Sequence, residues 1–150
     1  MPFPPIRYWL VCEAVRVEER GKATLLGFYG ISPDVTILLP VFPAPLAQLA
    51  FYLLGGQGQG DFDISTRLVD EAGAVVTETP MAHVVIAPPA GEIYINLNIQ
   101  LTGVILPHAG TYRFSLIVNG EEHSSATFRV RQQAPPAVPP MATLAQQPLC

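Results

Sequence analysis

Apolar and polar residues alternate most clearly between residues 110 and 130. The apolar positions of this segment are Tyr112, Phe114, Leu116 and Val118, followed by Ala126, Phe128 and Val130. A period of two is typical of β-strands that bury one face. The two runs are separated by Asn119-Gly120, which favours a type I′ turn because both central positions need positive φ. The pattern predicts a terminal β-hairpin.

The same pattern predicts further short strands upstream of this hairpin. Their ranges are 7–17, 23–31, 35–39, 46–54, 62–68, 75–78, 83–87 and 93–101. Gly21 and Gly73 are expected at left-handed turn positions, residues 40–45 as a proline-rich loop or sheet edge, and residues 102–110 as a crossing loop. No run of ten residues has a helical apolar period. We therefore predict an all-β domain, an antiparallel β-sandwich, with a closed barrel as the alternative.

Composition changes sharply near the end of the chain. Residues 132–150 contain five prolines and no charged residue, which favours an extended polyproline II conformation. We therefore divide the chain into a β-sandwich domain, residues 1–131, and an extended Pro-rich C-terminal tail, residues 132–150. Pro136 and Pro139 have the spacing recognised by proline-binding grooves. The residues predicted to dock on a partner are Pro135, Pro136, Val138, Pro139, Pro140, Met141 and Leu144.

Charge is sparse, and this narrows the range of partners. Charged residues make up 13% of the 150 residues, hydrophobic residues 49%, and the net charge is −4. The eight Lys and Arg are scattered, which argues against nucleic-acid binding. No apolar run is long enough to predict a membrane span, and no signal peptide is evident, so a cytoplasmic location is expected. A weakly charged surface favours self-association or a protein partner.

The sequence contains few residue patterns that are typical of metal or catalytic sites. Asp61 and Asp63 share one strand face but lack further oxygen ligands, so no metal site is predicted. His83, His108 and His123 have no neighbour at metal-ligand spacing and are expected at loop or surface positions. Serines are present, but no Gly-x-Ser-x-Gly motif accompanies them. We predict no cofactor and no enzymatic activity.

A second hypothesis concerns one strand face. Tyr94, Asn96, Asn98 and Gln100 form a polar strip opposite the apolar face of the strand at 93–101. Amide and aromatic groups on a flat strand face are features of carbohydrate-binding sandwiches. The alternative is an ordinary solvated face of a half-buried strand.

Gly110-Thr-Tyr-Arg-Phe114 resembles the Gly-x-Tyr entry into the penultimate strand of immunoglobulin-like sandwiches. In those domains the tyrosine hydroxyl bonds to nearby backbone, an arrangement called the tyrosine corner. The resemblance therefore implies an immunoglobulin-like topology. The cysteine that usually follows the tyrosine by two residues is replaced by Phe114, which excludes antibody-type disulfide pairing.

The segment Gly21-Lys-Ala-Thr-Leu-Leu-Gly-Phe-Tyr-Gly-Ile31 follows the apolar run Val11-Cys-Glu-Ala-Val15. Together with the Gly-x-Tyr-x-Phe terminal hairpin, it resembles an uncharacterised bacterial family of small cytosolic β proteins. The resemblance covers residues 7–131 and implies a fold, with no assigned activity and no functional residues.

The functional hypothesis is a non-catalytic protein-interaction or structural module, for example a subunit of a larger assembly. A carbohydrate-binding β-sandwich is the alternative, and a hydrolase with an unrecognised site is the third hypothesis.

Overall fold

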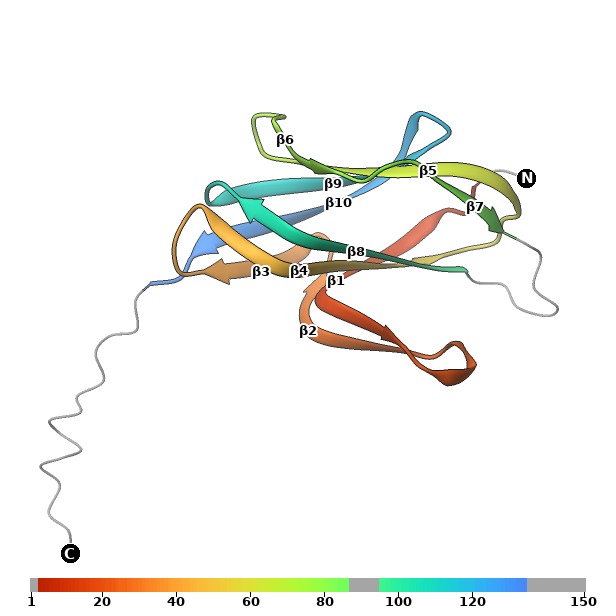
Figure 1. Ribbon diagram of the computed structural model, residues 1–150, viewed down its shortest axis with the longest axis horizontal. Coiled ribbons are helices and arrows are strands. Elements are labelled where there is room, and N and C mark those ends of the chain that lie inside the picture. The colour runs from red at the N-terminus through yellow and green to blue at the C-terminus, as the bar shows by residue number, and fades with distance from the viewer. Residues whose placement is uncertain (1–2, 87–94, 135–150) are drawn as a thin grey trace, which may run out of the picture.

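The computed structural model describes residues 3–86 and 95–134 and is built almost entirely of strands (Figure 1). The strands are β1 (Ile6–Val17), β2 (Ala23–Ile31), β3 (Asp34–Leu39), β4 (Ala44–Gly55), β5 (Gly60–Val69), β6 (Val75–Glu78), β7 (Ala82–Ile86), β8 (Ile95–Leu106), β9 (Gly110–Val118) and β10 (Glu121–Gln132). Within the described residues, the single helical element is the 3-10 turn Glu19–Gly21. No described helix has the length and apolar character to cross a membrane. The all-β prediction is confirmed.

The strands form one nearly closed, barrel-like sheet in the order β6-β5-β9-β10-β3-β2-β1-β4-β8, with β7 pairing on β5. Figure 1 shows two layers, one holding β5, β9 and β10 and the other holding β1, β4 and β8. Strands β2 and β3 connect the layers through two residue pairs only, Gly30 with Val35 and Ile31 with Asp34. The continuous sheet is not clearly the predicted immunoglobulin-like sandwich.

One strand pair departs from the predicted antiparallel arrangement. Strand β10 pairs parallel to β3, with Arg129 opposite Thr36 and Gln132 opposite Leu39. The other pairs along the described sheet are antiparallel. The last strand of the terminal hairpin therefore closes one side of the barrel against a strand near the N-terminus. Beyond it, the Gln133 N–H donates to the Leu39 carbonyl at 2.7 Å.

The sequence prediction for the connection at residues 102–110 was wrong in part. Strand β8 continues to Leu106 against β4, so residues 102–106 are strand, and Pro45 pairs with Ile105. The alternation is interrupted by Gly103, whose φ of +64° inserts an irregularity before the buried Val104 and Leu106 resume the pattern. In the first turn, Arg20 takes the left-handed conformation, with φ of +65°.

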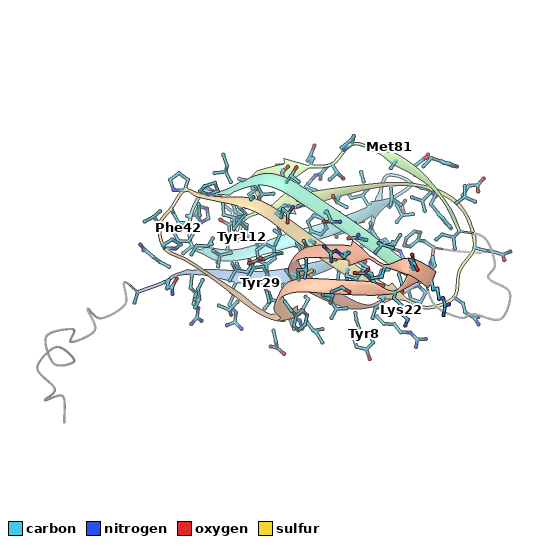
Figure 2. The ribbon with its side chains drawn as sticks, turned by 60° about the horizontal axis from the view of Figure 1, so that its bottom comes forward. Tyr8, Lys22, Tyr29, Phe42, Met81 and Tyr112 are labelled. Atoms are coloured by element: carbon cyan, nitrogen blue, oxygen red, sulfur yellow. The ribbon has the colours of Figure 1, made fainter. Side chains whose placement is uncertain are left out.

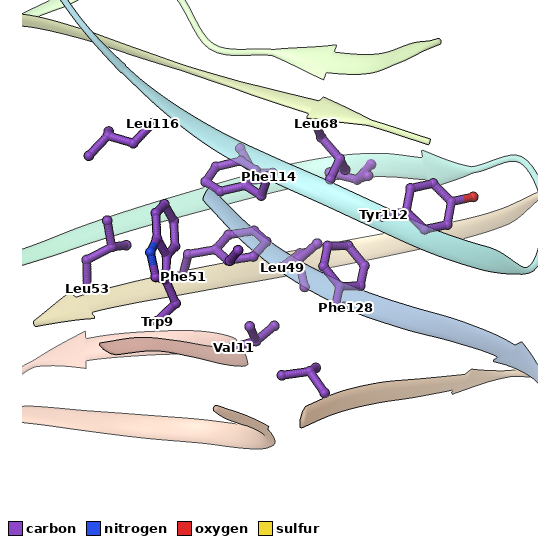
Figure 3. Close-up of a cluster of buried hydrophobic side chains, with 14 of the residues drawn as sticks. Trp9, Val11, Leu49, Phe51, Leu53, Leu68, Tyr112, Phe114, Leu116 and Phe128 are labelled. Carbon is purple, nitrogen blue, oxygen red and sulfur yellow. The ribbon is translucent and has the colours of Figure 1, made fainter. Parts of the chain in front are cut away.

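The core lies between the two layers and is rich in aromatic side chains (Figure 3). The rings of Phe51 and Phe114 stack with centroids 3.9 Å apart, and the Trp9 ring meets Phe114 edge-on at 5.9 Å. The predicted inner face of the terminal hairpin is buried throughout. At its turn, Asn119 and Gly120 have φ of 50° and 84°, as the type I′ prediction requires. The terminal hairpin is confirmed.

The β1–β2 hairpin leaves the barrel. Strand β1 pairs with β4 only from Ile6 to Cys12, and its register with β2 shifts between Val11 and Cys12. After Cys12, β1 keeps β2 as its partner in the described sheet. Figure 1 shows the hairpin projecting from the layer that contains β4 and β8. A small second cluster, centred on Cys12, Val15 and Ala50, packs beneath it.

Candidate functional site

Strand β2 is apolar and largely exposed. None of its nine residues is buried. Leu26, Phe28 and Ile31 expose 44%, 52% and 45% of their surface. Large apolar side chains scattered singly over a surface are ordinary, but several on one strand indicate a contact surface. Together with Tyr8 and Val17 of β1, this hairpin carries five of the eleven large exposed apolar residues in the described structure.

The backbone of β2 is open along most of one side. Strand β3 pairs with it only at Gly30 and Ile31, whereas β1 covers the opposite side from Ala23 onward. Residues 23–29 therefore have no strand partner on their outer side within the described structure. We call these seven residues the β2 edge. Unpaired strand N–H and C=O groups are a template for another strand.

The hairpin is nevertheless held in place. The Gln100 side-chain amide of β8 donates to the Val15 carbonyl at 3.2 Å. The Glu13 side chain lies over Gly27, whose φ of +60° is left-handed, and a Cβ built there would lie 2.5 Å from the Glu13 carboxyl carbon. Burial and the adjacent Glu13 carboxylate raise the pKa of Tyr29. These contacts present β2 as a fixed surface on the barrel. Figure 2 shows Tyr8, Lys22 and Tyr29 around the hairpin, with Lys22 at its far end.

The predicted carbohydrate strip is only partly brought together. Asn96, Asn98 and Gln100 are exposed and lie on one face of β8, whereas Tyr94 lies outside the described residues. The Gln100 amide is engaged in holding the hairpin. The described part of the strip is therefore Asn96, Asn98 and a Gln100 whose amide is already engaged.

His108 joins two loops at one end of the barrel. Its Nδ1 lies 2.9 Å from the Ala109 carbonyl oxygen and its Nε2 lies 3.2 Å from Asp70 Oδ2. Both partners are acceptors, so both ring nitrogens donate and the imidazolium is favoured. The bond to the Ala109 carbonyl and then the bond to Asp70 raise the pKa of His108. A ring with both nitrogens donating has no lone pair to act as a general base.

The other two histidines also have structural partners. His83 Nδ1 lies 3.0 Å from Asp63 Oδ1 across the β5–β7 pair, and this bond raises the pKa of His83. His123 Nε2 lies 3.0 Å from the Pro4 carbonyl and fixes the N-terminal segment. The sequence placed these histidines correctly at the surface but missed their pairings with Asp63, Asp70 and Pro4, because these three partners are 20 or more residues away. No hydrogen bond joins a serine to any of the three rings in the described structure.

Other reactive groups are also accounted for. Burial raises the pKa of the Cys12 thiol, whose sulfur donates to the Ala14 carbonyl at 3.3 Å, so the thiolate is disfavoured. Across residues 3–86 and 95–134, no three His, Cys, Asp or Glu side chains gather as a metal site would require. Asp61 and Asp63 are both exposed on β5. The predicted partner-binding tail residues Pro135, Pro136, Val138, Pro139, Pro140, Met141 and Leu144 lie outside the described residues.

Sequence reasoning missed the β2 edge, although a signal was present. Apolar residues are adjacent at Leu25-Leu26 and at Phe28-Tyr29. Adjacent apolar residues on a strand point to opposite faces, so neither face of this strand is polar. The segment from 23 to 29 also has no charged residue and no proline. These features indicate a strand that is covered on both faces, and in this chain β2 is covered only in part, through the half-buried Ala23, Leu25 and Tyr29.

Comparison with known proteins places the chain in a family without adding an activity. A search of curated proteins found no match. Among solved structures, the chain is similar to the alkylpurine DNA glycosylase AlkC of Pseudomonas fluorescens, bound to DNA containing an abasic site analogue, with 15% identity and a TM-score of 0.40. The similarity covers 66% of this chain and 28% of the glycosylase chain, and at that score it carries no argument. The sequence profile of a family of unknown function, DUF6941, matches residues 7–131, and the chain belongs to that family.

Proposed function

We propose that this protein is a non-catalytic interaction module that binds a protein partner through strand β2. The observation that carries the proposal is the β2 edge: an uncharged, unpaired strand edge that includes the exposed Leu26 and Phe28. Strand addition to such an edge supplies main-chain hydrogen bonds, and the neighbouring side chains supply selectivity. The engaged histidines and the protonated Cys12 thiol support a binding role over a catalytic one.

The experiment compares two double variants of the full chain. Leu26→Lys with Phe28→Lys places charge on β2, and the matched control, Val75→Lys with Val85→Lys, places the same charge on exposed positions of β6 and β7. Binding is measured as self-association by analytical ultracentrifugation and as quantitative capture of proteins from native lysate. We expect the β2 variant to lose an association that the control retains. Equal behaviour of the two variants and the unmodified chain would overturn the proposal.

We also propose that the fold is immunoglobulin-like. It is supported by the Tyr112 hydroxyl, which donates to the His108 carbonyl at 2.5 Å, four residues upstream, as in a tyrosine corner. A crystal structure would test it through the strand pairings. Loss of the short β2–β3 connection would favour two separate sheets, whereas backbone pairing between β6 and β8 would favour a closed barrel.

A further inference from the structure

We infer that the Pro-rich tail of a second copy of this chain binds where the N-terminal segment Phe3-Pro4-Pro5 is held, with Val138-Pro139-Pro140 taking the place of that segment. The inference goes beyond the proposed function, because the site involved contains no residue of β2. Three observations carry it. They are the contacts that hold the N-terminal segment, the recurrence of its sequence pattern in the tail, and the distance between each tail and the site of its own chain.

The N-terminal segment is held through its backbone carbonyls. His123 Nε2 donates to the Pro4 carbonyl at 3.0 Å, and the Gly56 N–H donates to the Pro5 carbonyl at 2.8 Å. A proline residue has a carbonyl but no backbone N–H. Recognition through carbonyls therefore suits a segment of consecutive prolines.

Two glycines leave room for the two proline rings. A Cβ built at Gly58 would lie 2.3 Å from Pro4 Cγ, and one built at Gly56 would lie 3.2 Å from Pro5 Cγ. Neither glycine has a left-handed φ. The close approach of the proline rings, rather than the backbone, is therefore what restricts a side chain here, most severely at Gly58.

The residue before the two prolines inserts an apolar side chain. Phe3 is 5% exposed, and its ring meets those of Phe62 and His123 edge-on, with centroids 5.0 and 4.9 Å apart. An open hollow of about 340 Å³, also lined by Phe3, Phe62 and His123, adjoins this contact. An incoming segment can therefore approach the rings while the N-terminal segment is still in place. We call Gly56, Gly58, Phe62 and His123 the proline site.

The pattern of an apolar residue followed by two prolines recurs in the tail at Val138-Pro139-Pro140. The tail, residues 132–150, has no charged residue, and its composition favours polyproline II, a conformation that is preformed for recognition. Ala134-Pro135-Pro136 and Ala87-Pro88-Pro89 have the same spacing, but alanine offers only a methyl group where Phe3 inserts its ring. We therefore choose Val138-Pro139-Pro140 as the segment that binds.

A tail cannot bring this segment to the proline site of its own chain. His123 lies near the start of β10 and Gln132 ends it, so the two are nine residues, about 30 Å, apart along the strand. Figure 1 shows the end of β10 and the start of β1 on opposite sides of the molecule. From Gln132 to Pro139 the chain advances seven residues, at most about 25 Å when fully extended. The tail that fills the site must therefore belong to a second copy.

The N-terminal segment competes with the incoming tail, because it is attached beside the site. The first experiment therefore measures self-association of the full-length chain by sedimentation equilibrium, with and without Phe3→Ser. Removing the ring frees the site and should strengthen association roughly tenfold. Pro139→Ala with Pro140→Ala, added to Phe3→Ser, should abolish this gain. The matched control, Pro135→Ala with Pro136→Ala, should retain it.

Two further measurements separate the proline site from a general exposure of apolar surface. Gly58→Ala added to Phe3→Ser places a Cβ where the proline ring would lie, so it should also abolish the gain. A labelled synthetic peptide of residues 132–150 should bind the Phe3→Ser chain, and should bind the unmodified chain roughly tenfold more weakly.

No binding of this peptide to either protein, or a gain that survives Gly58→Ala or the Pro139 and Pro140 changes, would overturn the inference. Leu26→Lys with Phe28→Lys should leave the gain from Phe3→Ser intact, since the proline site contains no residue of β2. Failure of the tail interaction is therefore distinguishable from failure of the proposed function.

Discussion

Strands β2 and β9 have the same length and similar apolar content, yet their burial is opposite. Each has nine residues. Five residues of β9 are buried, whereas none of β2 is. Strand β9 lies between β5 and β10 inside one layer, whereas β2 has β1 along one side and a short contact with β3 on the other. Hydrophobic content alone therefore does not determine burial; the neighbouring strands do.

The two strands also differ in pattern. In β9, Tyr112, Phe114, Leu116 and Val118 are spaced by two and share the inner face. In β2, the apolar residues are adjacent, at Leu25-Leu26 and Phe28-Tyr29, so both faces are apolar. Strand β9 covers the core, whereas the proposed function assigns the exposed part of β2 to a partner. The following variants test this difference.

The largest effect is expected from removing a phenylalanine from each strand. Phe114→Ala deletes a ring that stacks on Phe51 in the core and should cost about 3–5 kcal/mol of unfolding free energy. Phe28→Ala removes a half-exposed ring and should change the unfolding free energy by no more than about 0.5 kcal/mol. Urea unfolding at low protein concentration measures both. A cost for Phe28→Ala comparable to that for Phe114→Ala would show that β2 belongs to the core.

A smaller effect is expected from the tyrosine corner of β9. Tyr112→Phe removes the hydroxyl that donates to the His108 carbonyl and should cost about 1–3 kcal/mol. Tyr8→Phe, on the exposed face of β1, is the matched control and should be neutral. Urea unfolding is again the measurement. Equal stability of the two variants would argue that the Tyr112 hydroxyl bond has no structural role.

Sequence predicted much of the fold because the relevant signals are local. Alternation over 110–130 and the Asn119-Gly120 turn are contained in about twenty neighbouring residues, and both were confirmed. Strand β8 was cut short because Gly103 broke the alternation before the strand ended.

The candidate site was harder to predict because it depends on contacts between segments that are far apart in the sequence. The parallel pairing of β10 with β3 joins positions about ninety residues apart, and no local pattern encodes it. The open side of β2 likewise follows from the place where β3 begins to pair. The histidine pairings were missed for the same reason, as His108 meets Asp70 across 38 residues.

A third variant tests how firmly the hairpin holds its shape. Gly27→Ala places a Cβ at a left-handed residue and against the Glu13 side chain, and should cost about 1–2 kcal/mol. Because the Glu13 side chain is flexible, Glu13→Ala added to Gly27→Ala should recover only the part caused by the contact. Hydrogen exchange of β2 amides, compared with β9 amides, measures the effect. We expect faster exchange in β2 alone. Equally faster exchange in β2 and β9 would contradict the view that the hairpin opens separately from the barrel.

The smallest effect is expected from the His108–Asp70 contact at the end of the barrel near β9. Hydrogen bonds from the Ala74 amide, His108 and the Ala72 amide lower the pKa of Asp70, while the Ala109 carbonyl and Asp70 raise that of His108. Both groups are charged between their ordinary pKa values of 3.8 and 6.5, so the contact contributes fully there. Its contribution falls as pH drops through the lowered pKa of Asp70, and as pH rises through the raised pKa of His108.

Thermal unfolding from pH 3 to pH 9 tests this expectation by comparing the unmodified chain with His108→Gln. The difference in Tm between the two proteins should be largest between pH 3.8 and pH 6.5 and should shrink above and below this range. His123→Gln is the control, because His123 contacts the neutral Pro4 carbonyl and has no carboxylate partner in the described structure. A Tm difference for His108→Gln that does not change with pH would mean that the ring contributes packing against Tyr112, whose ring centroid lies 5.9 Å away, rather than charge.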